Sequence, residues 1–168
     1  MDTKAKLLFV DDEERVINLL RMMFRAEYEV FTTTSGHEAL QIVAQHRIDV
    51  IVSDQRMPQM LGIELLGEVR KRSPGTMRIL LTGYSDLSAI VGSVNDGEVF
   101  RFINKPWDHE EIKGTIADAV ARELGIVGIR TARGGARFAF AALGQLPGYA
   151  PGQLRRQRIG RIRLQELR

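Results

Sequence analysis

The chain has 168 residues, of which 44% are hydrophobic, which is the size and composition of one globular domain with a short addition. It has no cysteine, which excludes a disulfide framework and a thiolate metal site and fits a cytoplasmic protein. No stretch approaches the ~20 apolar residues that span a membrane. The acids that follow residue 10 also cut the N-terminal apolar run too short for a signal peptide.

The net charge of +3 combines two segments of opposite sign. Residues 1–124 hold an excess of acidic residues, whereas residues 125–168 hold nine arginines, no lysine and a single acid, Glu166. We therefore interpret residues 1–124 as a domain and residues 125–168 as a basic tail, rich in glycine and arginine, that is not an independent domain.

Within residues 1–124, short apolar stretches alternate with stretches whose apolar residues recur at helical spacing. The pattern predicts five strands, at residues 6–10, 28–33, 49–53, 78–82 and 99–103. It predicts five helices, at residues 14–24, 36–46, 62–72, 86–97 and 108–124. Ser35 and Glu38 have the spacing of a capping box at the start of the second helix. Strict alternation predicts an α/β fold, a doubly wound parallel sheet with right-handed crossovers and helices on both faces.

Polar and charged residues gather where the predicted strands end. Asp11 and Asp12 follow the first strand, Asp54 follows the third, Thr82 ends the fourth and Lys105 follows the fifth. Because open α/β sheets bind ligands beyond the carboxyl ends of their strands, we expect these side chains to share one rim. Three neighbouring carboxylates cannot all stay ionised without a counter-charge, which a hard divalent cation such as Mg²⁺ supplies.

The same residue types fit the chemistry of phosphoryl transfer. A carboxylate can act as a nucleophile toward a phosphoryl group and form an aspartyl phosphate. The cation and the lysine would then neutralise the phosphoryl oxygens, and the hydroxyl of Thr82 would bond one of them. The acidic run at residues 11–14 is explained in this way as part of a cation site.

In these residues the chain resembles the receiver (CheY-like) domain of bacterial two-component response regulators. The motifs that carry the resemblance are DDE at 11–13, DQRMP at 54–58, LTGYSD at 81–86 and KPW at 105–107. Each motif alone is weak, but all four occur in order and each at a strand end. The motifs are also similar to those of NtrC-like hydrogenase transcriptional regulators and of receivers linked to HD-GYP phosphodiesterases, and the sequence does not separate these two groups.

The resemblance implies a flavodoxin-like sheet with strand order 2-1-3-4-5 and assigns a Mg²⁺ site. Asp54 corresponds to the phosphoacceptor and Asp12 to a direct metal ligand. Asp11 corresponds to a ligand that acts through water, and the backbone carbonyl of Arg56 would complete the shell together with Asp54. This order places the first and third strands side by side, as a metal shared by Asp12 and Asp54 requires.

The resemblance also implies a switch. Lys105 would pair with the phosphoryl group, Thr82 would move to bond it, and Phe102 would change its rotamer with that movement. Pro106 matches a proline that follows a cis peptide bond. In such domains the face formed by the fourth helix, fifth strand and fifth helix then changes, and it often forms a homodimer or contacts an output domain.

Two bulky residues near the expected site correspond to positions that influence the lifetime of the phosphoryl group. They are Arg56, two residues after Asp54, and Tyr84, two residues after Thr82. A long side chain at each is expected to shield the aspartyl phosphate from water. The plain alternative is that both side chains point to solvent.

The implied function is a cytoplasmic signalling switch that receives a phosphoryl group from a sensor histidine kinase. It would control an output, which is expected to be transcription. It would catalyse only its own phosphorylation and dephosphorylation and would not contact a membrane. No output domain is recognisable in the chain, so a contact with nucleic acid is expected only through such a domain elsewhere. Two other classes are alternatives, and the residues after the first strand fit neither of them. A haloacid-dehalogenase-type phosphatase carries a D-x-D pair where this chain has Asp11-Asp12-Glu13, and a flavodoxin-like electron carrier needs a phosphate-cradling loop there.

The basic tail, residues 125–168, has two interpretations. Its arginines would attract nucleic acid or another anionic surface without sequence preference. Alternatively, the segment is not an evolved part of the domain, because its glycines break any continuation of the last helix and its apolar residues follow no sustained period. The second interpretation predicts that removing the tail leaves phosphorylation and the melting temperature of the domain nearly unchanged.

Overall fold

The structure is a computed structural model that describes residues 4–91 and 99–123. Of the two units into which the chain divides, Met1–Ile129 and Arg130–Arg168, only the first contains described residues. The predictions for the basic tail and for the end of the fourth helix at Gly97 therefore lie outside the described residues.

Strands and helices alternate along the described chain, as predicted. The strands are β1 (Lys6–Val10), β2 (Glu29–Thr33), β3 (Val50–Asp54), β4 (Met77–Thr82) and β5 (Arg101–Asn104). The helices are α1 (Glu14–Phe24), α2 (Gly36–Gln45), α3 (Gly62–Arg72), α4 (Tyr84–Val91) and α5 (His109–Glu123). The strands form one five-stranded sheet in the order β2-β1-β3-β4-β5, and every pairing is parallel. The α/β fold and its strand order are thereby confirmed.

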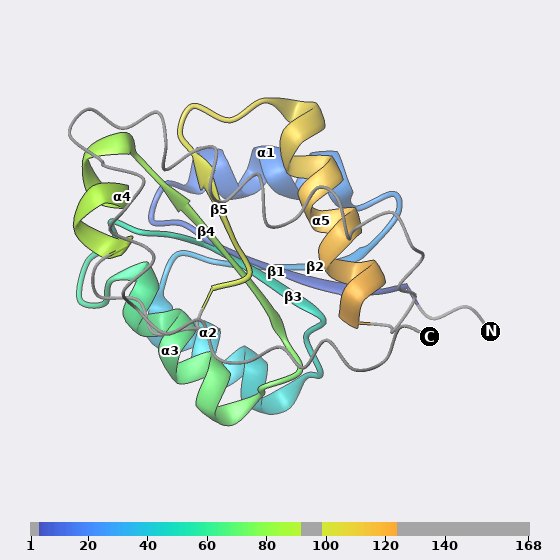
Figure 1. Cartoon of the computed structure of the whole chain (residues 1–168). Coiled ribbons are helices and arrows are strands. Elements are labelled where there is room, and N and C mark those ends of the chain that lie inside the picture. The colour runs from blue at the N-terminus through green and yellow to red at the C-terminus, as the bar shows by residue number, and fades with distance from the viewer. Residues whose placement is uncertain (1–3, 92–98, 124–168) are drawn as a thin grey trace, which may run out of the picture. The chain divides into compact units, whose positions relative to one another are not determined.

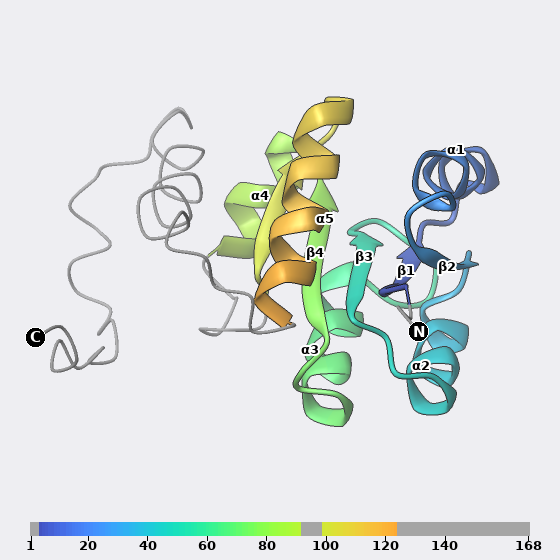
Figure 2. The ribbon, with the colours of Figure 1, turned by 90° about the vertical axis from the view of Figure 1, so that its right-hand side faces the viewer.

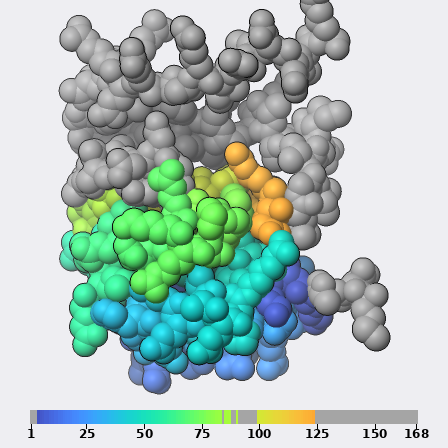
Figure 3. Space-filling view, turned by 90° about the horizontal axis from the view of Figure 1, so that it is seen from below, coloured from blue at the N-terminus to red at the C-terminus, as the bar shows by residue number. Residues whose placement is uncertain are grey.

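Two apolar clusters cover the two faces of the sheet. Alternate strand residues such as Phe9 and Val52 pack against α1 and α5 on one face. Their neighbours along the strands, such as Leu8 and Ile51, pack against α2 and α3 on the other face, where Ile90 of α4 joins them. The views of the ribbon from two sides show these layers (Figures 1 and 2), and the outer surfaces of α2 and α3 lie next to each other in Figure 3.

Some predicted boundaries are wrong by a few residues because backbone hydrogen bonds extend or shorten the elements. Strand β3 includes Asp54, which pairs with Leu81 of β4. Helix α4 begins at Tyr84, since the carbonyl of Gly83 accepts the N–H groups of Asp86 and Leu87, both at 3.1 Å. Strand β5 begins at Arg101 rather than at residue 99.

Half of the predicted capping box at α2 is also wrong. The hydroxyl of Ser35 accepts the N–H of Glu38 at 3.4 Å, as predicted. The carboxylate of Glu38, however, accepts a hydrogen bond from the hydroxyl of Thr33 and not from the backbone of Ser35. The reason is that the N–H of Ser35 already donates to the Thr33 hydroxyl, at 3.1 Å.

Gly62 lets the first turn of α3 lie directly against the end of β3. Its N–H donates to the carbonyl of Gln55 at 2.9 Å. A Cβ atom at Gly62 would lie 2.1 Å from the carbonyl oxygen of Asp54 and 2.8 Å from Cδ1 of Leu80. Since the nearest obstacle is backbone, no side-chain rotation relieves this contact, and only glycine fits.

Gly62→Ala is expected to lower the free energy of unfolding by at least about 1–3 kcal/mol, because an overpacked site forces the backbone to move. Gly67 of the same helix is the matched control, since a Cβ there meets nothing within 4 Å. Gly67→Ala should instead stabilise the domain by roughly 0.5–1 kcal/mol through helix propensity. Urea unfolding of the two variants measures both effects, and equal shifts would contradict the packing argument.

Candidate functional site

The acidic residues come together because β1 and β3 are neighbours in the sheet. Val10 pairs with Ser53, so Asp11 and Asp54 follow at adjacent strand ends. Asp11, Asp12 and Asp54 offer carboxylate oxygens that all lie within 4.8 Å of one another. Asp11 is 1% exposed and Asp54 5% exposed, whereas Asp12 is open to solvent. The structure thus brings together the three carboxylates that the sequence placed on one rim.

Lys105 is the positive partner of this cluster. Its Nζ lies 2.7 Å from Oδ1 of Asp54 and 3.2 Å from Oδ2 of Asp11. The backbone fixes the residue, because its N–H donates to the carbonyl of Thr82 at 2.9 Å. The Lys105–Pro106 peptide bond is cis, as the resemblance implied. The ring of Trp107 also faces the ammonium group, with Nζ 5.9 Å from the ring centroid.

Asp11 has both of its oxygens engaged by the protein. Oδ1 accepts the N–H of Glu13 at 2.9 Å, and Oδ2 faces Lys105. Asp12 is exposed, so its oxygens are open to a ligand. This difference fits a cation that Asp12 contacts directly and Asp11 reaches through water, although that division, and the contribution of the Arg56 carbonyl, stay predictions.

Burial and charge compete at Asp54. Burial raises the pKa of its carboxyl group, the nearby charge of Asp11 raises it further, and the hydrogen bond and charge of Lys105 offset only part of the rise. Burial alone would lower the pKa of Lys105, but its bonds and attraction to Asp54 and Asp11 outweigh that and raise it. The lysine therefore stays charged, and additional positive charge at the site would help to ionise Asp54.

Thr82 and Phe102, the two residues of the switch hypothesis, lie on the neighbouring strands β4 and β5. Thr82 ends β4 with a buried side chain, and its hydroxyl donates to the carbonyl of the next residue, Gly83, at 3.3 Å. Thr82 pairs with Asn104 of β5. Phe102 comes two residues before Asn104, so its side chain lies on the same face of the sheet as that of Thr82. Phe102 is partly buried against the cluster on the α2–α3 face. Their joint movement stays a prediction.

The side chain of Arg56 is largely exposed and contacts Asp86. Its guanidinium donates two hydrogen bonds to the carboxylate of Asp86, at 2.7 and 2.6 Å. Sequence reasoning missed Asp86, although it is part of the motif LTGYSD, because only the fold brings the two loops together. The backbone of Tyr84 begins α4, but its side chain lies outside the described residues, so its shielding role stays a prediction.

Gln55 is a second residue that sequence reasoning missed. It is 6% exposed, and its Oε1 accepts the N–H of Ile63 at 2.9 Å, in the first turn of α3. Its own N–H donates to the carbonyl of Leu81 in β4 at 2.9 Å. Gln55 thus fixes the chain that directly follows Asp54. Gln55 is part of the motif DQRMP, but the motif gave no sign that its side chain binds the backbone of α3.

A doubly wound sheet of this order, with an aspartate triad and a lysine on its carboxyl edge, defines the class of receiver domains. The family model described as "Response regulator receiver domain" matches residues 7–117. The chain belongs to this family, and it is a receiver domain of two-component response regulators. No helix in the described part of the chain has the length and apolar character needed to cross a bilayer.

The relatives include a hydrogenase transcriptional regulator, which is one of the two groups that the motifs suggested. The hydrogenase transcriptional regulatory protein HoxA of Cupriavidus necator is 39% identical over 119 residues, which are 71% of this chain and 25% of HoxA. The chain thus spans about a quarter of the length of this curated relative. The signal receiver domain of an HD domain-containing protein from Pseudomonas fluorescens is 31% identical, with a TM-score of 0.69 over 74% of this chain and 93% of that one.

A second similar structure bears on the cation. It is the response regulator TrrA of Thermotoga maritima in complex with Mg²⁺ and BeF, 30% identical, with a TM-score of 0.61 over 68% of this chain and 98% of TrrA. The oxygen donors of Asp11, Asp12 and Asp54 are the ligand type that Mg²⁺ prefers. The residues present therefore fit this cation.

Asp12→Ala is expected to abolish measurable Mg²⁺ binding without lowering stability in EDTA. Asp12 is an exposed member of a crowded acidic cluster, so its removal deletes a ligand and relieves repulsion. Metal titration and a thermal melt in EDTA test the two halves separately. Unchanged Mg²⁺ affinity would contradict the assignment, and a large loss of melting temperature would contradict the repulsion.

Mg²⁺ affinity should also fall with decreasing pH, and the decline should begin at a pH above the usual pKa range of an aspartate. The cause is the raised pKa of Asp54, which must lose its proton to act as a ligand. Without metal the same shift means that the folded state binds the proton more tightly than the unfolded state, so ionising Asp54 costs stability as the pH rises. Mg²⁺ titrations at several pH values measure this, with Asp54→Asn as the control. The decline of Mg²⁺ affinity at the higher pH should appear only in the parent protein.

Proposed function

We propose that the domain is a phosphorylation-dependent signalling switch that accepts a phosphoryl group from a sensor histidine kinase onto Asp54. The observation that supports this most is the position of Asp54. Its carboxylate is nearly buried, pairs with Lys105 at 2.7 Å and lies in one cluster with Asp11 and Asp12. Mg²⁺, held by these three aspartates, would supply charge to neutralise the phosphoryl oxygens.

In the proposed reaction, a carboxylate oxygen of Asp54 attacks the phosphorus atom of the donor. A phosphorus–oxygen bond to Asp54 forms while the phosphorus–nitrogen bond to the donor histidine breaks, and the electron pair leaves with the imidazole nitrogen. Lys105 is close enough to Asp54 to neutralise the phosphoryl group once it is attached there. Asp11, 3.2 Å from Nζ, helps to keep the ammonium group in this position. The hydroxyl of Thr82, with one weak bond at 3.3 Å, is free to turn toward a phosphoryl oxygen.

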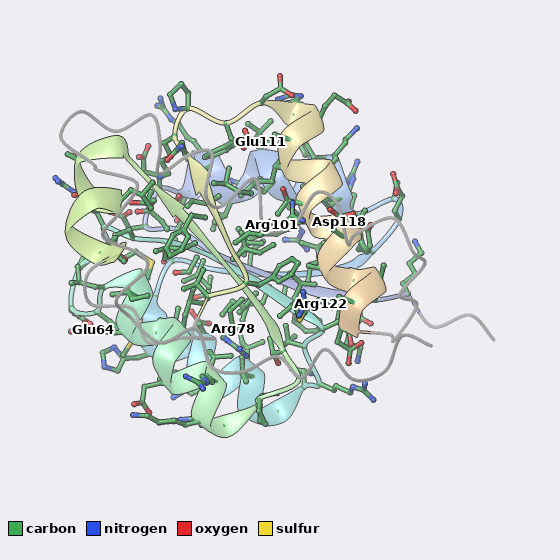
Figure 4. The ribbon with its side chains drawn as sticks, in the orientation of Figure 1. Glu64, Arg78, Arg101, Glu111, Asp118 and Arg122 are labelled. Atoms are coloured by element: carbon green, nitrogen blue, oxygen red, sulfur yellow. The ribbon has the colours of Figure 1, made fainter. Side chains whose placement is uncertain are left out.

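The output is proposed to run through the face of α4, β5 and α5. On this face Arg101 pairs with Asp118 at 3.2 Å, and the guanidiniums of Arg101 and Arg122 lie 5.3 and 5.4 Å from the ring of Phe100. Figure 4 shows Arg101, Asp118 and Arg122 together along β5 and α5. Such charged groups around an aromatic side chain suit a polar partner surface, either a second copy of the domain or an output domain.

The proposed setting is the cytoplasm, with transcription as the output. The similarity to HoxA, which is named as a transcriptional regulatory protein, supports this choice. Nucleic acid would be contacted only by an output domain. The domain itself would act on no external substrate and would catalyse only the gain and loss of its own phosphoryl group.

The test is incubation with acetyl phosphate and Mg²⁺ followed by intact mass measurement. The parent protein should gain one phosphoryl group, and Asp54→Asn, which keeps the shape but lacks the nucleophile, should gain none. An equal gain in the variant would overturn the assignment of Asp54. Sustained release of phosphate from a generic phosphate ester would instead identify a phosphatase.

A further inference from the structure

An ion pair joins the loop that follows the acceptor to the first turn of α4. Arg56 lies two residues after Asp54, and Asp86 lies four residues after Thr82, in the first turn of α4. Two hydrogen bonds at 2.7 and 2.6 Å connect them. The side chain of Arg56 is 72% exposed and that of Asp86 is 21% exposed. The pair therefore links the acceptor loop to the start of α4 at the edge of the site.

Arg56 lies within the field of two acidic groups. The hydrogen bonds and charge of Asp86 raise its pKa most, and the charge of Asp54 adds to the rise. The carboxylate of Asp86 turns back over the chain that follows Thr82, because a Cβ built on Gly83 would lie 4.0 Å from Oδ2 of Asp86. Arg56 is thus held by one anion while it is already attracted by the acceptor.

An arginine is suited to change between these two groups. Its planar guanidinium binds carboxylate and phosphoryl oxygens in the same two-pronged way. Phosphorylation of Asp54 would replace a carboxylate of single charge by a group with a charge of about −2 and three strong acceptor oxygens. Because the side chain of Arg56 is largely exposed, water screens its charge, and a stronger anion nearby can draw it away from Asp86.

We propose that Arg56 is a phosphoryl-binding residue that Asp86 holds in the unphosphorylated protein and that passes to the phosphoryl group once Asp54 is modified. The exchange rests on the proposed function of Asp54. It frees Asp86 and thereby the first turn of α4, which begins the face proposed to carry the output. Asp86 is in this scheme a positioning residue, because it acts only through Arg56.

The scheme predicts opposite effects for the two partners. Arg56→Gln removes a contact to the phosphoryl group and should weaken binding of a phosphoryl analogue about two- to fivefold. Asp86→Asn removes the competitor and should strengthen that binding by about the same factor. The double variant should match Arg56→Gln, because Asp86 has no effect without the arginine.

The probe is beryllofluoride with Mg²⁺, titrated into the full chain. Binding is read from the fluorescence of Trp107, the single tryptophan, whose ring centroid lies 5.9 Å from Nζ of Lys105. Lys71→Gln is the matched control, because it removes an exposed ion pair of similar length, 2.7 Å to Glu68, on α3. Its affinity should equal that of the parent protein. Thermal melts in EDTA should show the same small loss for Arg56→Gln and Asp86→Asn, since each breaks the same pair.

Opposite shifts in affinity with matching melts support the exchange. Tighter binding by both variants would mean that the ion pair only restrains the loop and that Arg56 never contacts the phosphoryl group. Unchanged binding by both variants would mean that the pair is an ordinary surface ion pair. Either result overturns the proposal. If the parent protein binds no beryllofluoride, the proposed function of Asp54 fails and the exchange fails with it. The parent titration therefore separates the two failures.

Discussion

The arrangement around the site depends on one electrostatic constraint, which is that three carboxylates and one ammonium group share the carboxyl edge of the sheet. Asp54 is nearly buried beside Asp11, so neither water nor distance relieves their repulsion. Lys105 contacts both carboxylates and compensates them in part. The surrounding backbone holds the charged groups in place: the N–H of Glu13 binds Asp11, and the carbonyl of Thr82 binds the N–H of Lys105.

The strand order explains why each position has its residue type. Strands β1 and β3 are neighbours, so short aspartates at their ends meet. Strand β5 is separated from β3 by β4, so a residue that follows β5 must reach across the end of β4 to contact Asp54. The four-carbon stem of Lys105 spans this gap. Thr82 ends the intervening strand and therefore lies between the lysine and the acceptor with a short side chain, as the order requires.

The sequence predicted most of the fold and the buried part of the site because both follow from local patterns. Alternating apolar runs define the strands, and the residue after each run lies on the carboxyl edge whatever the detailed packing. Side-chain partners were harder to predict. Thr33 captures Glu38 from the predicted capping box, and Arg56 pairs with Asp86, 30 residues away. The motif DQRMP includes Gln55 but does not predict its role, which is to bind a backbone group of α3 that only the folded chain brings close.

The site thus divides into two parts with different physical roles. In the buried part, removing Lys105 would leave the nearly buried carboxylate of Asp54 beside Asp11 without its ammonium partner. That part is suited to hold a nucleophile in a constant position. The exposed part contains Asp12 and Arg56, and Arg56 pairs there with the partly buried Asp86. Solvent screens the two exposed side chains, so their partners can change at little cost. A conformational switch requires a contact that differs between its two states. In this domain the exposed part can supply that contact while the buried part keeps the acceptor in place.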